Sequence, residues 1–170
     1  MSDSAQDIQW FPGHMAQSMR KMAERMALVD AVIEVADARL PARSRNPSLD
    51  ELIGTKPRVL LLGREDLADP AATVNWIAYE EGRGLRTVAV NGKQRGSVGH
   101  AMPVLEALTT ARKTVRAMVV GIPNTGKSTV INGLAKRTAA KAEDKAGVTR
   151  SLQWYRVSPA LEIMDTPGIL

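Results

Sequence analysis

The sequence predicts an α/β protein, with a mostly parallel sheet of about six strands and helices on both of its faces. Short apolar runs alternate with segments of helical periodicity along the chain, and Gly, Asn and Pro residues separate them. A glycine-rich motif follows one apolar run and opens a helix, which is typical of a parallel sheet that binds phosphate. At 170 residues, the chain has the size of one domain with a substantial core.

The N-terminal region predicts a helix that begins near Pro12-Gly13-His14. Apolar residues recur there at spacings of four, three, four and three, which places them on a single helix face. They are Met15, Met19, Met22, Met26 and Val29. We interpret this stripe as a surface packed on the core, in preference to a methionine-rich docking groove.

The rest of the first half predicts strands separated by helices. Ser48 and Gly54 are typical of the cap and the end of a short helix over residues 48–52. The strands are expected at residues 31–36, 58–62 and 86–90.

A longer helix is predicted from its two ends. Asp69 is typical of an N-cap and Pro70 of the first helical position. The helix is expected to stop at Gly82 or Gly84.

The second half of the chain continues the alternation. Its expected elements are a helix over 101–111, a strand over 115–120, a helix over 127–136, a polar segment over 138–150, and two strands over 152–157 and 161–164. Only two strands follow the glycine-rich loop, although such a loop normally follows a central strand. Its strand therefore needs neighbours from upstream, which indicates a rearranged strand order.

The segment Gly121–Ser128 matches G-x-x-x-x-G-K-[ST], the phosphate-binding loop of P-loop NTPases. Small residues allow successive backbone N–H groups to surround a phosphate, while Lys127 reaches the outer phosphates and the Ser128 hydroxyl binds Mg²⁺. The strand before the loop and the helix after it disfavour the alternative, a glycine-rich turn without a ligand. The predicted nucleotide-binding residues are Pro123, Asn124, Thr125, Gly126, Lys127, Ser128 and Thr129.

A second motif, Asp165-Thr166-Pro167-Gly168, follows an apolar strand near the end of the chain. Asp165 is placed to hold Mg²⁺ through water, and the Gly168 N–H can face a terminal phosphate. Between the two motifs, Thr149 can offer its hydroxyl and carbonyl to Mg²⁺ once the third phosphate is bound. The alternative for Thr149 is an ordinary surface threonine. The predicted metal ligands are Ser128, Thr149 and Asp165.

Composition excludes some classes of protein. The chain has no Cys, which excludes disulfides and thiolate metal sites and fits a reducing cytoplasm. No apolar run has the length of a membrane span, and residues 1–7 are polar and acidic, unlike a signal peptide. We therefore expect a cytoplasmic protein without a membrane partner. We also expect a monomer. The net charge of +5 favours a polyanionic partner but also fits an ordinary basic protein.

Further motifs carry a family resemblance. Trp10–Met15 reads W-F-P-G-H-M, Asp37–Pro41 reads D-A-R-L-P, and Ser44–Pro47 reads S-R-N-P. With the two phosphate motifs in this order, residues 8–170 resemble the circularly permuted GTPase family. The resemblance implies a doubly wound, Ras-like sheet in which the base-reading strands precede the phosphate loop. It also implies GTP/GDP and Mg²⁺ as ligands, and a slowly hydrolysing switch that acts on the rRNA of a large ribosomal subunit precursor.

The guanine-reading motif of that family is Asn-Lys-x-Asp, and this chain has Gly63-Arg64-Glu65-Asp66 in its place. Asp66 keeps the carboxylate that accepts two hydrogen bonds from guanine, and Arg64 can lie along the base. Gly63 removes an amide, which should cost about 1–3 kcal/mol of base discrimination. Asn91-Gly92 stands where the resemblance places a second base-contacting loop.

This departure leaves other functions open. One alternative is a nucleotide-binding assembly factor with little or no hydrolysis. An ATP-using enzyme is disfavoured by Asp66, which is suited to guanine.

Hydrolysis requires a positioned water. Ile169 occupies the place where Ras-type enzymes carry a glutamine. The resemblance suggests His14 as the substitute, with Lys127 and Thr149 as the other catalytic residues; alternatively, His14 caps the first helix. Asn124 resembles the residue that helps to hold K⁺ beside the phosphates.

Two groups of basic residues are candidate contacts for rRNA phosphate, or else parts of a solvated cationic surface. They are Arg39, Arg43 and Arg45 in one loop, and Lys136, Arg137, Lys141 and Lys145 in the other.

The resemblance also predicts the domain organisation. Residues 1–29 are expected to form an N-terminal segment and helix packed on a permuted G domain over residues 30–170. That domain is expected to end before the switch helix, without the C-terminal helical domain of the family.

Overall fold

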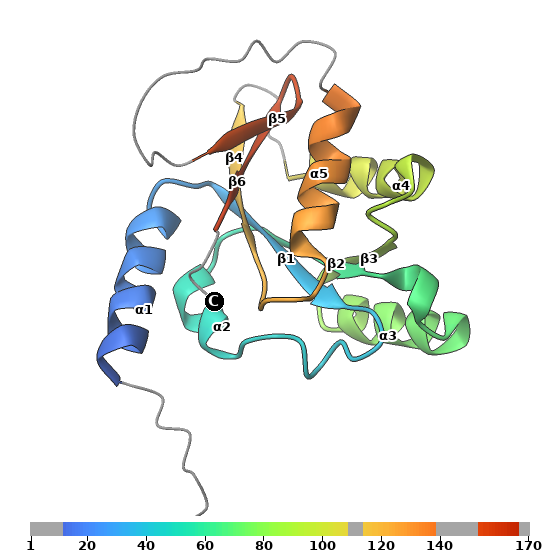
Figure 1. The fold of residues 1–170 in the computed structure, drawn as a ribbon, viewed down its shortest axis with the longest axis horizontal. Helices are drawn as coiled ribbons and strands as arrows, with labels where there is room; N and C mark the ends of the chain where they lie inside the picture. Colours follow the sequence, from blue (N-terminus) through green and yellow to red (C-terminus); the bar gives the residue numbers. More distant parts are fainter. Residues whose placement is uncertain (1–11, 109–113, 139–152, 167–170) are drawn as a thin grey trace, which may run out of the picture.

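The computed structural model describes residues 12–108, 114–138 and 153–166 (Figure 1). Their strands are β1 (Ala31–Asp37), β2 (Arg58–Gly63), β3 (Arg86–Val90), β4 (Val115–Val120), β5 (Trp154–Ser158) and β6 (Leu161–Asp165). Their helices are α1 (Pro12–Met26), α2 (Ser48–Ile53), α3 (Pro70–Gly82), α4 (Arg95–Glu106) and α5 (Lys127–Thr138), with a 3₁₀ turn η1 over Glu65–Leu67.

The strands form one six-stranded sheet in the order β3-β2-β1-β4-β6-β5. Only the β5–β6 pair is antiparallel among the described strands. β4 lies in the middle, and its neighbour on one side, β1, comes from upstream in the sequence. The α/β fold and the rearranged strand order predicted above are therefore confirmed. All five parallel strands end at the same edge of the sheet, which brings Asp37, Gly63 and Asp165 to that edge.

Helices cover both faces of the sheet because consecutive residues of its central strands are buried, and successive side chains point to opposite faces. Ile33 and Val35 of β1 pack with α4 and α5 on one face. On the other face, Val32 packs with α1 and α2, while Ala36 belongs to a cluster that includes Trp76 of α3. This arrangement leaves the loops at the carboxyl edge as the site where predicted functional residues meet.

α1 carries the predicted apolar stripe into the core. Met22 and Met26 are 0% and 3% exposed, and they share a cluster with Val29, Met118 and Met164. The interpretation of the stripe as a core-facing surface is therefore confirmed for these residues.

Two element predictions were wrong. α4 begins at Arg95 instead of residue 101, and its first turns pack Val98 and Ala101 in the core. Gly96 and Ser97 are residue types that favour loops, and they obscured the start of this helix. Ser48 is not a side-chain cap: Pro47 precedes α2, and the Asn46 carboxamide oxygen accepts the Ser48 N–H at 3.0 Å.

Other ends follow the sequence. The Asp69 carboxylate accepts the Ala72 N–H at 2.7 Å, and α2 stops at Gly54 with a φ of 56°. No helix in the described ranges is long and apolar enough to cross a membrane.

Candidate nucleotide-binding site

The glycine-rich loop joins β4 to α5 at the carboxyl edge of the sheet. Asn124 has a φ of 65° and Gly126 a φ of 88°, so the loop backbone turns through the left-handed region twice. The Thr125 hydroxyl is buried and donates to the Ile122 carbonyl at 2.9 Å, which closes the loop on itself. Alternation of this kind points successive N–H groups into a common concavity, where an anion binds.

Lys127 is the first residue of α5, and its ammonium contacts the second motif, Asp165-Thr166-Pro167-Gly168. Its ammonium donates to the Thr166 carbonyl at 3.1 Å and to the Thr166 hydroxyl at 3.3 Å. The same Nζ lies 3.4 Å from Oδ1 of Asp165. Thr166 is held in turn by a bond from its hydroxyl to the Val119 carbonyl at 2.9 Å. The structure thus brings together two motifs that lie far apart in the sequence.

The oxygen donors at this edge suit Mg²⁺. Ser128 offers an exposed hydroxyl in the first turn of α5, and Asp165 offers a carboxylate at the end of β6. Mg²⁺ prefers oxygen ligands and keeps several waters, and it binds proteins through few side chains together with substrate phosphates. Within the described ranges, no group of three or more His, Asp or Glu side chains gathers that could hold a metal ion. A Mg²⁺ ion here would share Ser128 and Asp165 with phosphate and water.

The predicted base-reading loop lies beside the phosphate loop. Gly63 ends β2 so close to it that a Cβ atom on Gly63 would stand 2.8 Å from the Thr125 carbonyl oxygen. Arg64 follows in the left-handed region with a φ of 60°, and its Cγ lies 3.4 Å from where a Cβ on Gly126 would stand. Asp66 is exposed in η1.

The two predicted base loops are joined by a residue that sequence reasoning missed. Ser97 of α4 accepts the Asn91 N–H at 2.8 Å and donates to Oε1 of Glu65 at 2.7 Å. Oδ1 of Asn91 accepts the Lys93 N–H at 3.1 Å, so this side chain shapes its own turn. Because α4 begins at Arg95, Ser97 lies in its first turn, beside the loop that contains Asn91 and Gly92. A sequence prediction that began this helix at Arg95 would have indicated Ser97 as a neighbour of that loop.

Gly92 and Thr129 meet where the second predicted base loop packs on α5. A Cβ on Gly92 would lie 2.9 Å from the Thr129 backbone. Both residues line an open groove of about 590 Å³, whose other residues are Lys93, Arg95, Asn132, Gly133 and Lys136. Exposed Lys136 therefore lies in a basic groove beside the predicted base site.

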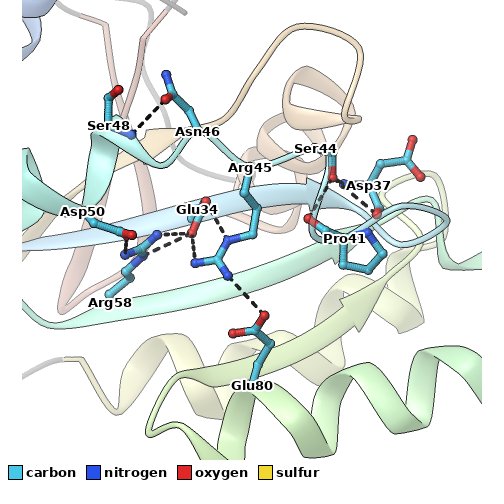
Figure 2. Close-up of polar contacts among 10 residues, drawn as sticks. All are labelled: Glu34, Asp37, Pro41, Ser44, Arg45, Asn46, Ser48, Asp50, Arg58 and Glu80. Atoms are coloured by element: carbon cyan, nitrogen blue, oxygen red, sulfur yellow. Dashed lines mark hydrogen bonds and ion pairs between the residues drawn. The ribbon is translucent and has the colours of Figure 1, made fainter.

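An ion cluster around buried Glu34 holds the loop from residue 38 to 47 (Figure 2). The cluster lies on the face of β1 that α2 and α3 cover. Arg45 donates to both carboxylate oxygens of Glu34, at 3.0 and 3.1 Å, and to Glu80 at 3.1 Å. Arg58 of β2 also binds Glu34 and continues the cluster to Asp50. Glu34 is 1% exposed.

The cluster corrects one expectation about the basic residues. Burial lowers the pKa of Arg45, but its bonds to Glu34 outweigh that effect and raise it overall. Arg45, with its side chain 19% exposed and paired with Glu34 and Glu80, is therefore a structural cation, and the expectation that it is a freely solvated surface charge was wrong. Its contact with RNA phosphate stays a prediction.

Asp37, at the end of β1, joins this loop to the site. It accepts three hydrogen bonds from Arg39, and Nη1 of Arg64 lies 3.5 Å from its Oδ2. The hydrogen bonds and charge of Arg39, with a weaker contribution from Arg64, hold the pKa of Asp37 below its usual value despite burial.

Several predicted site residues fall outside the described part of the chain. They are Thr149, Gly168, Ile169, Lys141 and Lys145, as well as the side chains of His14 and Arg137. The backbone of His14 stands third in α1, inside the helix, so the alternative that His14 is the helix cap was wrong.

The chain resembles known proteins across nearly its whole length. The sequence model of a family described as "50S ribosome-binding GTPase" matches residues 116–170. "Ribosome biogenesis GTPase A" of Bacillus cereus is 43% identical over 174 residues, covering 96% of this chain and 59% of that protein. The mouse "Mitochondrial ribosome-associated GTPase 1" is 37% identical, covering 95% of this chain and 55% of that protein.

Solved structures show the same likeness. YlqF of Thermotoga maritima, crystallised with GNP, superposes with a TM-score of 0.67 at 30% identity, covering 91% of this chain and 58% of that one. A GDP-bound YlqF structure gives a TM-score of 0.66 at 32% identity, covering 89% of this chain and 58% of that one. The chain spans 59% to 62% of the bacterial relatives named "Ribosome biogenesis GTPase A" that it matches at 41% to 43% identity.

Proposed function

Because this chain belongs to the circularly permuted GTPase family of the ribosome biogenesis GTPase A proteins, we propose that it is a GTP-binding, slowly hydrolysing switch in large-subunit assembly. Its GTP state would dock on a precursor of the large ribosomal subunit through rRNA, and hydrolysis would release it. The names of the relatives, which refer to ribosomes and to GTPases, support this proposal.

The observation that carries the proposal is the position of the Lys127 ammonium. From the start of α5 it lies 3.4 Å from Asp165, which ends β6, and within hydrogen-bonding distance of Thr166, the next residue. A terminal phosphate would take over the Lys127 contacts, because an ammonium binds a phosphate as a point charge. The site is thus suited to a nucleotide with outer phosphates.

The same geometry supports the metal ions that we propose for the site. Mg²⁺ would be held by Ser128 and Asp165, with Thr149 as a third ligand in the triphosphate state, and it would neutralise charge on the phosphates. Asn124 is exposed at the turn of the phosphate loop, where it supports a second proposal, that K⁺ assists beside the phosphates. His14 is our proposal for the residue that orients the attacking water.

The base preference is proposed to be guanine, read by Asp66 with Arg64 along the base and Asn91-Gly92 on its other side. The close approach of Gly63 to Thr125 favours a weakened discrimination, because no amide side chain is available there. The same feature favours the alternative function, a nucleotide-binding assembly factor with little hydrolysis.

We also propose that residues 1–29 form an N-terminal segment and helix packed on a permuted G domain over residues 30–170, and the burial of Met22 and Met26 of α1 supports this. We propose that the chain acts as a cytoplasmic monomer.

A competition between GDP and ADP tests the nucleotide proposal. Calorimetric titration of the chain should give tighter binding for GDP than for ADP, and Lys127→Ala should abolish both. Equal affinities for the two nucleotides would contradict guanine specificity. GTP turnover, measured with and without K⁺ and large ribosomal subunits, separates the switch from the inactive assembly factor.

A further inference from the structure

The Asp37 carboxylate lies between two guanidinium groups at the carboxyl edge of the sheet. Its Oδ1 accepts the backbone N–H of Arg39 at 2.9 Å and Nε of Arg39 at 3.0 Å. Its Oδ2 accepts Nη2 of Arg39 at 2.7 Å and lies 3.5 Å from Nη1 of Arg64. With its side chain 10% exposed, Asp37 is poorly hydrated, so these two arginines are its main charge partners.

Arg64 spans the distance from this carboxylate to the phosphate loop. Its backbone is in the left-handed region, with a φ of 60° and a ψ of 37°. Its Cγ and Nε lie 3.4 and 3.7 Å from the Cβ position of Gly126, so the side chain lies against the phosphate loop and its head reaches Asp37. A long, partly exposed arginine loses much rotamer freedom in this pose, and a charged partner at its head offsets that loss.

Asp37 itself is fixed by contacts that do not involve the nucleotide site. Its N–H donates to the buried Ser44 hydroxyl at 2.8 Å. Arg45, which follows Ser44 in the sequence, donates hydrogen bonds to Glu34 and Glu80. These contacts hold the backbone at Asp37 and the loop that follows it, and Figure 2 shows them.

We propose that Asp37 is a positioning residue for nucleotide binding, whose carboxylate holds Arg64 across the phosphate loop while Arg39 competes for the same oxygens. Arg39 has 45% of its side chain exposed, so it is the more accessible of the two competitors. The inference rests on the proposed function, because its effect is measured as nucleotide affinity.

A double-mutant cycle on the full 170-residue chain tests the proposal, with GDP binding measured by calorimetry. Arg64→Met keeps most of the stem and removes the guanidinium, while Asp37→Asn keeps the shape and removes the charge. Each single variant should weaken GDP binding about threefold to tenfold, and the double variant should be no weaker than the weaker single variant. Glu81→Gln, which removes one exposed carboxylate from α3, is the matched control and should bind GDP like the parent.

Arg39→Gln tests whether Arg39 and Arg64 compete for the Asp37 carboxylate, because it removes the guanidinium of Arg39. Freed from Arg39, the carboxylate is available to Arg64 alone, so GDP affinity should be retained or should rise by up to about threefold. A loss as large as that of Asp37→Asn would overturn the competition.

The proposal fails if Asp37→Asn weakens GDP binding as much in the Arg64→Met background as in the parent, because Asp37 would then act only on loop stability. If Asp37→Asn does not fold, Arg64→Lys and Arg64→Met decide instead. Lysine still reaches the carboxylate and should keep GDP affinity; equal losses in both variants overturn the proposal. Absence of GDP binding by the parent chain would instead overturn the proposed function, and this inference with it.

Discussion

At the scale of single residues, Gly63 stands where the resemblance to the circularly permuted GTPases places the Asn of the guanine-reading motif. The sequence shows only that an amide is missing. The structure adds that the phosphate loop occupies the space beside it, because a Cβ would stand 2.8 Å from the Thr125 carbonyl oxygen. The phosphate loop can lie this close only because residue 63 has no side chain. An asparagine at position 63 would therefore require the loop to move.

Gly63→Asn should for this reason weaken the protein instead of repairing the guanine motif. Overpacking against backbone costs about 1–3 kcal/mol, so the melting temperature should fall and GDP affinity should not rise. Thermal unfolding and calorimetry measure the two effects. Gly82→Ala is the control, because a Cβ there meets nothing within 4 Å. Tighter GDP binding by Gly63→Asn would show that the loop moves aside easily.

Asp37 predicts a pH dependence. The hydrogen bonds and charge of Arg39, followed by the charge of Arg64, hold its pKa below the ordinary value in the folded protein. The stabilisation from ionised Asp37 is thus complete above the pKa that Asp has in the unfolded chain, about 3.9. It is lost as the pH falls through the lower pKa of Asp37 in the folded protein.

Asp37→Asn should therefore destabilise the protein near neutral pH by about 1–3 kcal/mol, and the difference from the parent should shrink below about pH 4. Urea unfolding at a series of pH values measures it. A difference that stays constant down to strongly acidic pH would mean that the charge of Asp37 is not responsible.

At the scale of elements, sequence patterns located the strands and most helices because one face or both faces of each are apolar. They failed where a contact between distant residues decides the structure. Glu34 sits in the apolar run of β1, and nothing local indicates that Arg45 and Arg58 neutralise it. In the same way, Ser97 could be recognised as the link between the two predicted base loops only after α4 was known to begin at Arg95.

The ion cluster at Glu34 should be costly to break. Glu34→Gln removes the buried counter-charge shared by Arg45 and Arg58, whose side chains are 19% and 16% exposed, and breaking one side of a buried pair costs about 3–5 kcal/mol. Denaturant unfolding measures this loss. Asp50→Asn removes an outer partner of Arg58 whose side chain is 64% exposed, so it should cost at most about 1 kcal/mol. Similar losses for both variants would contradict the distinction between the buried and exposed parts of the cluster.

At the scale of the whole molecule, the order of motifs was enough to predict that the phosphate-loop strand takes a neighbour from upstream. The register of β1 with β4 bears this out, with Ala31 opposite Ala117 and Ile33 opposite Val119. The sequence could not supply the contact between Lys127 and Asp165, since it arises only when β4 and β6 pair. Residues 139–152 include Thr149, whose predicted role stays a prediction.

The sheet order predicts a gradient of protection against hydrogen exchange. β1 and β4 lie in the centre and their backbone groups pair on both sides, whereas β3 and β5 lie at the edges. Amides of β1 and β4 should exchange slowest and those of β3 and β5 faster, because edge strands open at lower free energy. Exchange followed by mass spectrometry or NMR measures the gradient. Equal protection of β5 and β4 would contradict it.

The strand order has a consequence for how the protein is made. A translating ribosome releases β1, β2 and β3 before β4. These three strands can therefore pair first, while the side of β1 that later pairs with β4 has no neighbouring strand. Until β4 emerges, the backbone groups of residues 31–34 that later bond to it stay available to other extended chains. Rapid synthesis of the stretch between β3 and β4 would shorten that interval, and a pause within it would favour mispairing between nascent chains.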